Sequence, residues 1–83
     1  MEETKIALIG IIVHDTKDTE RLNQVLHDYQ QYIVGRMGIP YAQKGVNIIS
    51  IVIDAPENAI SSLSGKLGMI KGIRVKSMVA KTK

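Results

Sequence analysis

The sequence predicts an α+β domain in which one antiparallel four-stranded sheet carries two helices on a single face. The first observation behind this prediction is that residues 6–13 and 46–53 are apolar almost throughout. A half-solvated strand alternates apolar and polar residues, because successive side chains point to opposite faces. The second observation is the order of elements: strand, helix, strand, strand, helix, strand. The two apolar runs are therefore expected as strands with both faces covered.

The first strand is expected over residues 5–13 and is followed by an amphipathic helix that ends near residue 30 or 31. Four apolar side chains in this region recur at helical spacing: Leu22, Val25, Leu26 and Tyr29. Asp18 stands where the positive end of the helix dipole favours an acid.

The second strand is expected over residues 32–39 and the third over residues 46–53. Pro40 predicts that the second strand lies at a sheet edge or stops there, and the glycines within it predict a bulge or a close backbone approach. Residues 41–45 predict a hairpin loop, with Gly45 free to adopt a positive φ.

The second helix is expected to begin at Asp54 and to end at Gly68. Asp54 fits a capping residue, Pro56 fits the first turn, and Glu57 follows Asp54 at the spacing of a capping box. Glycine at position 68 is typical of a helix C-terminus. A last strand is expected over residues 72–80.

This order of elements is that of the ferredoxin-like fold, here as one domain spanning residues 1–83. Right-handed crossovers place the first and third strands at the centre of the sheet, which agrees with their apolar runs. Both helices then cover one face, and the other face stays open.

The open face predicts self-association, because a chain of 83 residues has little material to cover both sides of a sheet. Several branched side chains in water form a larger apolar patch than soluble monomers expose. A symmetric second copy is the simplest cover, so a dimer or tetramer is expected. The predicted interface residues are Leu8, Ile12, Val46, Ile48 and Val52. If the two faces are reversed, the interface includes Ile11 and Ile49 instead.

Composition narrows the function classes. The chain has no cysteine, which removes disulfides and thiolate chemistry, and residues 58–83 carry six bases and no acid. This basic block fits either a contact to nucleic acid or the protection of an exposed sheet edge. The longest apolar run has eight residues, too short for a membrane span, and the N-terminus is acidic. No membrane contact and a cytoplasmic location are expected.

Candidate site residues gather where the first strand ends. His14, Asp15 and Thr16 precede a helix N-terminus, where free N–H groups can hold a small anion, but a strand-end residue and a helix cap explain them as well. No metal or other cofactor is expected, because His14 and His27 have no thiolate beside them in the sequence. The serines show no base partner, so an enzyme is not expected.

Two blocks resemble the family of iron-only hydrogenase system regulators: YIVGRMGIP at residues 32–40 and LSGKLGMIKGIRVKS at residues 63–77. The resemblance covers nearly the whole chain. It implies a ferredoxin-like domain related to ACT domains and to the C-terminal domain of the nickel-responsive regulator. The implied role is regulatory, through a small-molecule effector or a protein partner.

The chain departs from those relatives in two ways. Its first strand begins by residue 5, which leaves no room for a ribbon-helix-helix domain, so specific DNA binding is not expected. The ACT resemblance implies a ligand near His14, Asp15 and Thr16, facing three residues of a neighbouring subunit: Gly68, Ile70 and Gly72. The loop after the first strand lacks the glycine common in ACT domains.

The expected function is therefore an oligomeric ligand-sensing or protein-interaction module in transcriptional or hydrogenase-system regulation. One alternative is a nucleic-acid-associated protein that uses the basic C-terminal strand without sequence preference. The other is a small dimeric ferredoxin-like enzyme.

Overall fold

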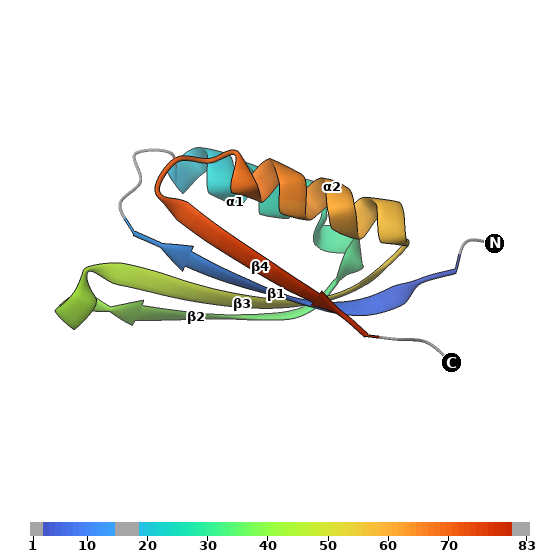
Figure 1. The fold of residues 1–83 in the computed structure, drawn as a ribbon, viewed down its shortest axis with the longest axis horizontal. Coiled ribbons are helices and arrows are strands. Elements are labelled where there is room, and N and C mark those ends of the chain that lie inside the picture. The colour runs from blue at the N-terminus through green and yellow to red at the C-terminus, as the bar shows by residue number, and fades with distance from the viewer. Residues whose placement is uncertain (1–2, 15–18, 81–83) are drawn as a thin grey trace.

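The computed structural model describes residues 3–14 and 19–80. Four strands and two α-helices follow in the predicted order, with short 3-10 turns η1 and η2 on either side of the second strand (Figure 1). The elements are β1 (Lys5–Val13), α1 (Thr19–Asp28), η1 (Gln30–Tyr32), β2 (Ile33–Tyr41), η2 (Ala42–Lys44), β3 (Val46–Ala55), α2 (Glu57–Gly68) and β4 (Ile73–Val79).

The strands form one antiparallel sheet in the order β2-β3-β1-β4, and both helices lie against the same face of it (Figure 1). The two apolar strands β1 and β3 are therefore central neighbours. This arrangement confirms the predicted ferredoxin-like α+β fold.

The core fills the space between the sheet and the helices. Alternate residues of the central strands point into it, and Ile9, Ile11, Ile51 and Ile53 are fully buried there. The helices contribute the apolar stripes that cover them: Leu22, Val25, Leu26, Ile60, Leu63 and Leu67. Because these stripes face one side of the sheet only, the other side receives no helix.

The β2–β3 hairpin is longer than the sequence predicts. β2 continues through Pro40 to Tyr41, which an edge strand tolerates because its outer side needs no ladder hydrogen bond. The predicted irregularity is present as a register shift between Ile33 and Gly35. Gly45 closes the turn with φ of 66°, as expected.

The predicted start of the second helix is wrong. β3 continues through Asp54 to the buried Ala55, and Pro56 precedes the first helical residue without a side-chain cap. The Glu57 carboxylate lies 3.2 Å from the Lys5 ammonium instead of completing a capping box.

Gly68 is the last residue of α2, as predicted, but Met69 after it stays right-handed. The positive φ of the α2–β4 joint falls on Gly72, at 82°. The predicted dipole contact of Asp18 lies outside the described residues.

The helices contact each other through Tyr29 and Ser62, whose hydroxyl oxygens are 2.7 Å apart. The Lys66 ammonium lies 5.2 Å from the centre of the Tyr29 ring. The hydrogen bond to Ser62 lowers the pKa of Tyr29, partial burial opposes the shift, and Lys66 adds to the lowering.

Candidate functional site

The side of the sheet opposite the helices is an apolar surface, which we call the open face. Directly paired residues of antiparallel strands point to the same side, so the register gives its rows from β2 across to β4. The rows are Ile39-Ile48-Ile12-Arg74, Met37-Ser50-Gly10-Lys76 and Gly35-Val52-Leu8-Met78. Six large apolar side chains in these rows are 37–65% exposed: Leu8, Ile12, Met37, Ile39, Ile48 and Met78.

All five predicted interface residues lie on the open face. Leu8 and Ile12 come from β1, and Val46, Ile48 and Val52 come from β3. Sequence reasoning missed Met37, Ile39 and Tyr41 of the edge strand β2 and Met78 of β4, which extend the same surface. The alternate spacing of residues 37, 39 and 41 was the available signal. The interface itself stays a prediction.

A hollow of about 640 Å³ lies on the open face beside Gly10. Its lining includes Gly10, Ile12, Ile48, Arg74 and Lys76. The hollow is therefore apolar in the middle of the sheet and basic toward the β4 edge.

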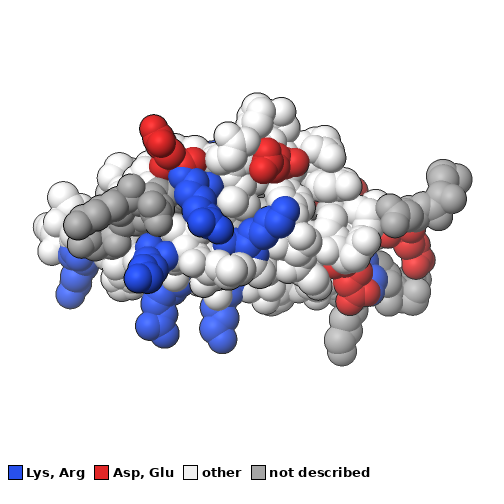
Figure 2. Space-filling model, turned by 90° about the horizontal axis from the view of Figure 1, so that it is seen from above, with Lys and Arg blue, Asp and Glu red and all other residues white. Residues whose placement is uncertain are grey.

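Charged side chains are unevenly distributed over the molecule. Figure 2, which looks onto the helix layer, shows most visible Lys and Arg side chains on the half that contains the tip of the β2–β3 hairpin. Asp and Glu side chains gather along the upper edge and toward the opposite end. Arg74 and Lys76 line the hollow on the open face. In the described part of the chain, the ion pair between Lys5 and Glu57 involves neither of them and does not neutralise their charge.

Two residues of the predicted ligand site at the end of β1 are neighbours within one chain, whereas the prediction placed them on two subunits; the site itself stays a prediction. The His14 amide donates a hydrogen bond of 2.7 Å to the Gly72 carbonyl, so these two residues are neighbours. Gly68 ends α2 nearby in the sequence, but the Ile70 side chain is buried in the core and is not available to a ligand. Asp15 and Thr16 lie outside the described residues.

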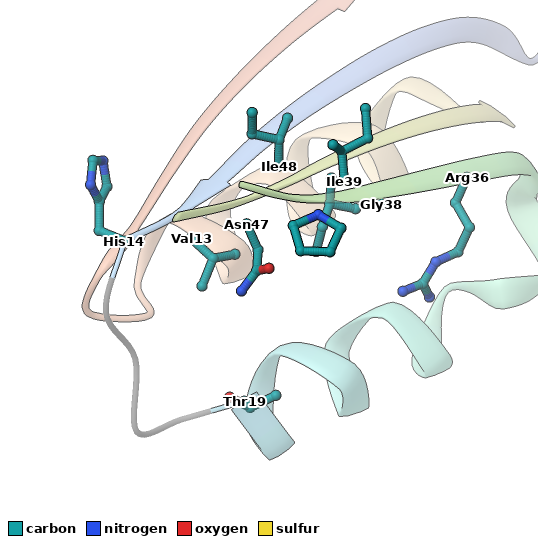
Figure 3. A pocket seen from close by; sticks show the side chains of 10 residues that line it. Val13, His14, Thr19, Arg36, Gly38, Ile39, Asn47 and Ile48 are labelled. Atoms are coloured by element: carbon teal, nitrogen blue, oxygen red, sulfur yellow. The ribbon is translucent and has the colours of Figure 1, made fainter. Parts of the chain in front are cut away.

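A cavity of about 530 Å³ lies at the same end of the sheet, between α1 and the β2–β3 hairpin. Figure 3 shows Val13, Asn47 and Arg36 pointing from the sheet toward the α1 side, where Thr19 stands. His14, Ile39 and Ile48 point to the other side of the sheet. The cavity is thus centred on Arg36 and Asn47, whereas the His14 side chain belongs to the open face.

Metal ligands do not cluster in the described part of the chain: residues 3–14 and 19–80 hold no group of three His, Asp or Glu side chains arranged to bind an ion. The expectation of no metal concerns the whole protein and stays a prediction. Neither described helix has the length and apolar character needed to cross a membrane.

The order of elements, the sheet order and the one-sided helix layer define the class as a ferredoxin-like α+β domain. Residues 5–77 match the family model described as "TM1266-like: Iron-only hydrogenase system regulator, putative", and the chain belongs to this family. This confirms the resemblance seen in the sequence.

Among solved structures, the chain is similar to the uncharacterized protein TM1266 from Thermotoga maritima, with 34% identity and a TM-score of 0.91. That alignment covers 95% of this chain and 100% of the other. No curated protein matches the sequence. The family description names a regulator of an iron-only hydrogenase system. The link between this chain and such a system rests on that description.

Proposed function

We propose that this chain is an oligomeric regulatory module of an iron-only hydrogenase system, and that a second copy binds its open face. The family description supports the regulatory part. The single observation that carries the assembly is the open face, where six large apolar side chains are 37–65% exposed in one continuous set of rows.

The open face is suited to a copy of itself. Complete burial of one Ile, Leu or Met side chain contributes roughly 1.5–3 kcal/mol, so even the exposed part of six such residues is a substantial driving force. The apolar residues extend from the β2 edge to the middle of the face, and Arg74 and Lys76 lie at its β4 border. Charged residues at the border of an apolar surface are common in protein interfaces. Two identical faces related by a two-fold axis bring like surfaces together.

The experiment is sedimentation velocity at micromolar concentration on the wild type and on three lysine variants. The wild type should sediment as a dimer or tetramer, and Ile12→Lys and Ile48→Lys should sediment as monomers or aggregate. Met69→Lys is the matched control, because Met69 is an exposed apolar residue at the C-terminal end of α2 and not on the open face. A monomeric wild type, or open-face variants that assemble normally, would refute the proposal.

A small-molecule effector at the end of β1 is the second candidate. It is favoured by the cavity beside α1, where Arg36 offers a cation and Asn47 an amide, and by the contact between His14 and Gly72. Small acids such as acetate, pyruvate and glutamate are suitable probes in NMR titrations. Unchanged affinity in Arg36→Gln and Asn47→Ala, whose side chains point into the cavity, or a bound ligand located elsewhere in a crystal, would contradict this candidate. That the chain is not an enzyme stays a prediction, and turnover assays can test the alternative of a small ferredoxin-like enzyme.

A further inference from the structure

We propose that the hollow beside Gly10 binds a small amphipathic carboxylate, with its apolar body on Ile12 and Ile48 and its carboxylate between Arg74 and Lys76. The inference rests on the proposed regulatory function in one respect, since the bound molecule would act as the effector of that module. Its location differs from the end of β1, where the sequence placed a ligand.

Gly10 is the first observation, because the backbone of this fold does not require glycine there. The described glycines with positive φ are Gly45 and Gly72, and Gly10 has an ordinary strand conformation. A Cβ built on Gly10 would meet only the Lys76 carbonyl oxygen, at 4.0 Å. Glycine inside a strand costs roughly 0.5–1 kcal/mol relative to alanine. The missing side chain therefore keeps space free on the open face at the expense of stability.

The second observation is the pair of cations at the edge of that space. Arg74 and Lys76 are two residues apart on β4, so their side chains share the open face, opposite Ile12 and Gly10. The strand residues of the open face include one acid, Asp54, which pairs with Ile6 two rows away from Lys76. Among the described strand residues no acid is placed closer than Asp54, so the two like charges repel each other, and an anion between them removes that repulsion.

The class of ligand follows from the two parts of the site. A carboxylate matches the planar guanidinium of Arg74 and accepts further hydrogen bonds from the Lys76 ammonium. The isoleucine side chains of the lining offer nothing to a fully polar anion such as free phosphate, but they bury an aliphatic or aromatic body. The volume of about 640 Å³ is within the range of small-molecule sites.

The site lies on the surface where a second copy is proposed to bind, so ligand binding and assembly are thermodynamically linked. A molecule in the hollow changes the surface that the second copy meets. Occupancy of the hollow is therefore a physical route from effector concentration to the oligomeric state.

The test is a titration of the full chain with octanoate and with 1-octanol, which has the same number of carbon atoms and no charge, followed by calorimetry and NMR. Octanoate should bind the wild type at least tenfold more tightly than octanol. The double variant Arg74→Gln/Lys76→Gln should lose at least tenfold in octanoate affinity and keep its octanol affinity. Gly10→Leu should abolish binding of both, because its side chain fills the hollow. Arg36→Gln, a matched loss of one charge at the other cavity, should bind octanoate normally.

Equal affinity for the two probes, no octanoate binding at millimolar concentration, or full binding by the double variant would overturn the inference. Loss of binding in Arg36→Gln would also overturn it, by placing the anion at the cavity beside α1. If Gly10→Leu does not fold, the double variant decides alone, because both of its substitutions are at exposed positions. Sedimentation of the same samples separates the two proposals: a monomeric wild type that binds octanoate refutes only the assembly, and an oligomer that does not bind it refutes only this site.

Discussion

The two faces of the sheet are built from the same strands and the same residue types, but their surroundings differ completely. Ile11 is 0% exposed under the helices, while its neighbour Ile12 on the open face is 41% exposed. On β3, Ile51 is buried and Ile48 is not. The comparison shows what an apolar strand can predict. Its sequence indicates that both faces of the sheet need to be buried, but it does not indicate which layer buries each face. Here the chain supplies one layer, and the second copy proposed above would supply the other.

The largest expected effect separates these faces by stability. Ile11→Ala should lower the free energy of unfolding by about 2–5 kcal/mol, because it opens a cavity in a closed core. Ile12→Ala should lower it by about 1 kcal/mol or less in the dissociated chain, since that side chain is already partly in water. Urea denaturation at submicromolar concentration measures both. Equal losses would show that the open face is as well packed as the core.

The second prediction uses protein concentration to detect the missing layer. If a second copy covers the open face, the denaturation midpoint of the wild type should rise as its concentration is increased tenfold, because association stabilises the folded chain by mass action. The midpoint of Ile12→Lys should not change. A wild-type midpoint that is independent of concentration over the micromolar range would leave the open face without a partner copy.

The third prediction concerns the basic border of the open face. Any affinity for DNA should be weak, indifferent to sequence and lost by about 0.2 M salt, as expected if Arg74 and Lys76 contact phosphate alone. Gel shifts with one operator-like duplex and a scrambled duplex, at several salt concentrations, test this. Discrimination between the duplexes at physiological salt would contradict it and favour the nucleic-acid alternative.

The smallest expected effect lies on the covered side, between the helices. The pKa of Tyr29 is lowered, mainly by its hydrogen bond to Ser62, so the folded chain releases the phenolic proton at a lower pH than the unfolded chain. The unfolded state then holds more protons between the two pKa values, and stability rises with pH across that alkaline window. Ultraviolet titration of tyrosine should show the shift reduced in Ser62→Ala. An unchanged titration curve would remove the role assigned to Ser62.

The sheet was predictable because its evidence is local. The two-sided apolar runs identified β1 and β3, and alternation separated residues 9, 11 and 13 from residues 8 and 12. Which set faces the helices came from the structure. The helix boundaries were less predictable. Asp54 has the chemistry of a cap, but Ala55 after it packs into the core, and that burial extends β3 past the expected start of α2.

The candidate sites were less accessible to sequence reasoning, because they depend on register across distant strands. Glycine at position 10 reads as a minor interruption of an apolar run. Its significance appears only when pairing places Lys76 opposite Gly10 and Arg74 opposite Ile12. Ile70 shows the converse case, since the ACT resemblance implied a ligand contact there and the structure buries its side chain.

The pairing of β1 with β4 has a practical consequence for the topology of the chain. Val79 pairs with Ala7, and the Ala80 amide donates a hydrogen bond of 2.8 Å to the Ile6 carbonyl, so the start of β1 and the end of β4 lie together, far from the hairpin tip (Figure 1). A short linker can therefore join the two ends, and the chain can be reopened within the exposed turn at Ala42–Lys44. Such a circular permutant keeps every strand pairing and loses only the covalent connection between β2 and β3. Its new termini lie beside the cavity at the end of β1.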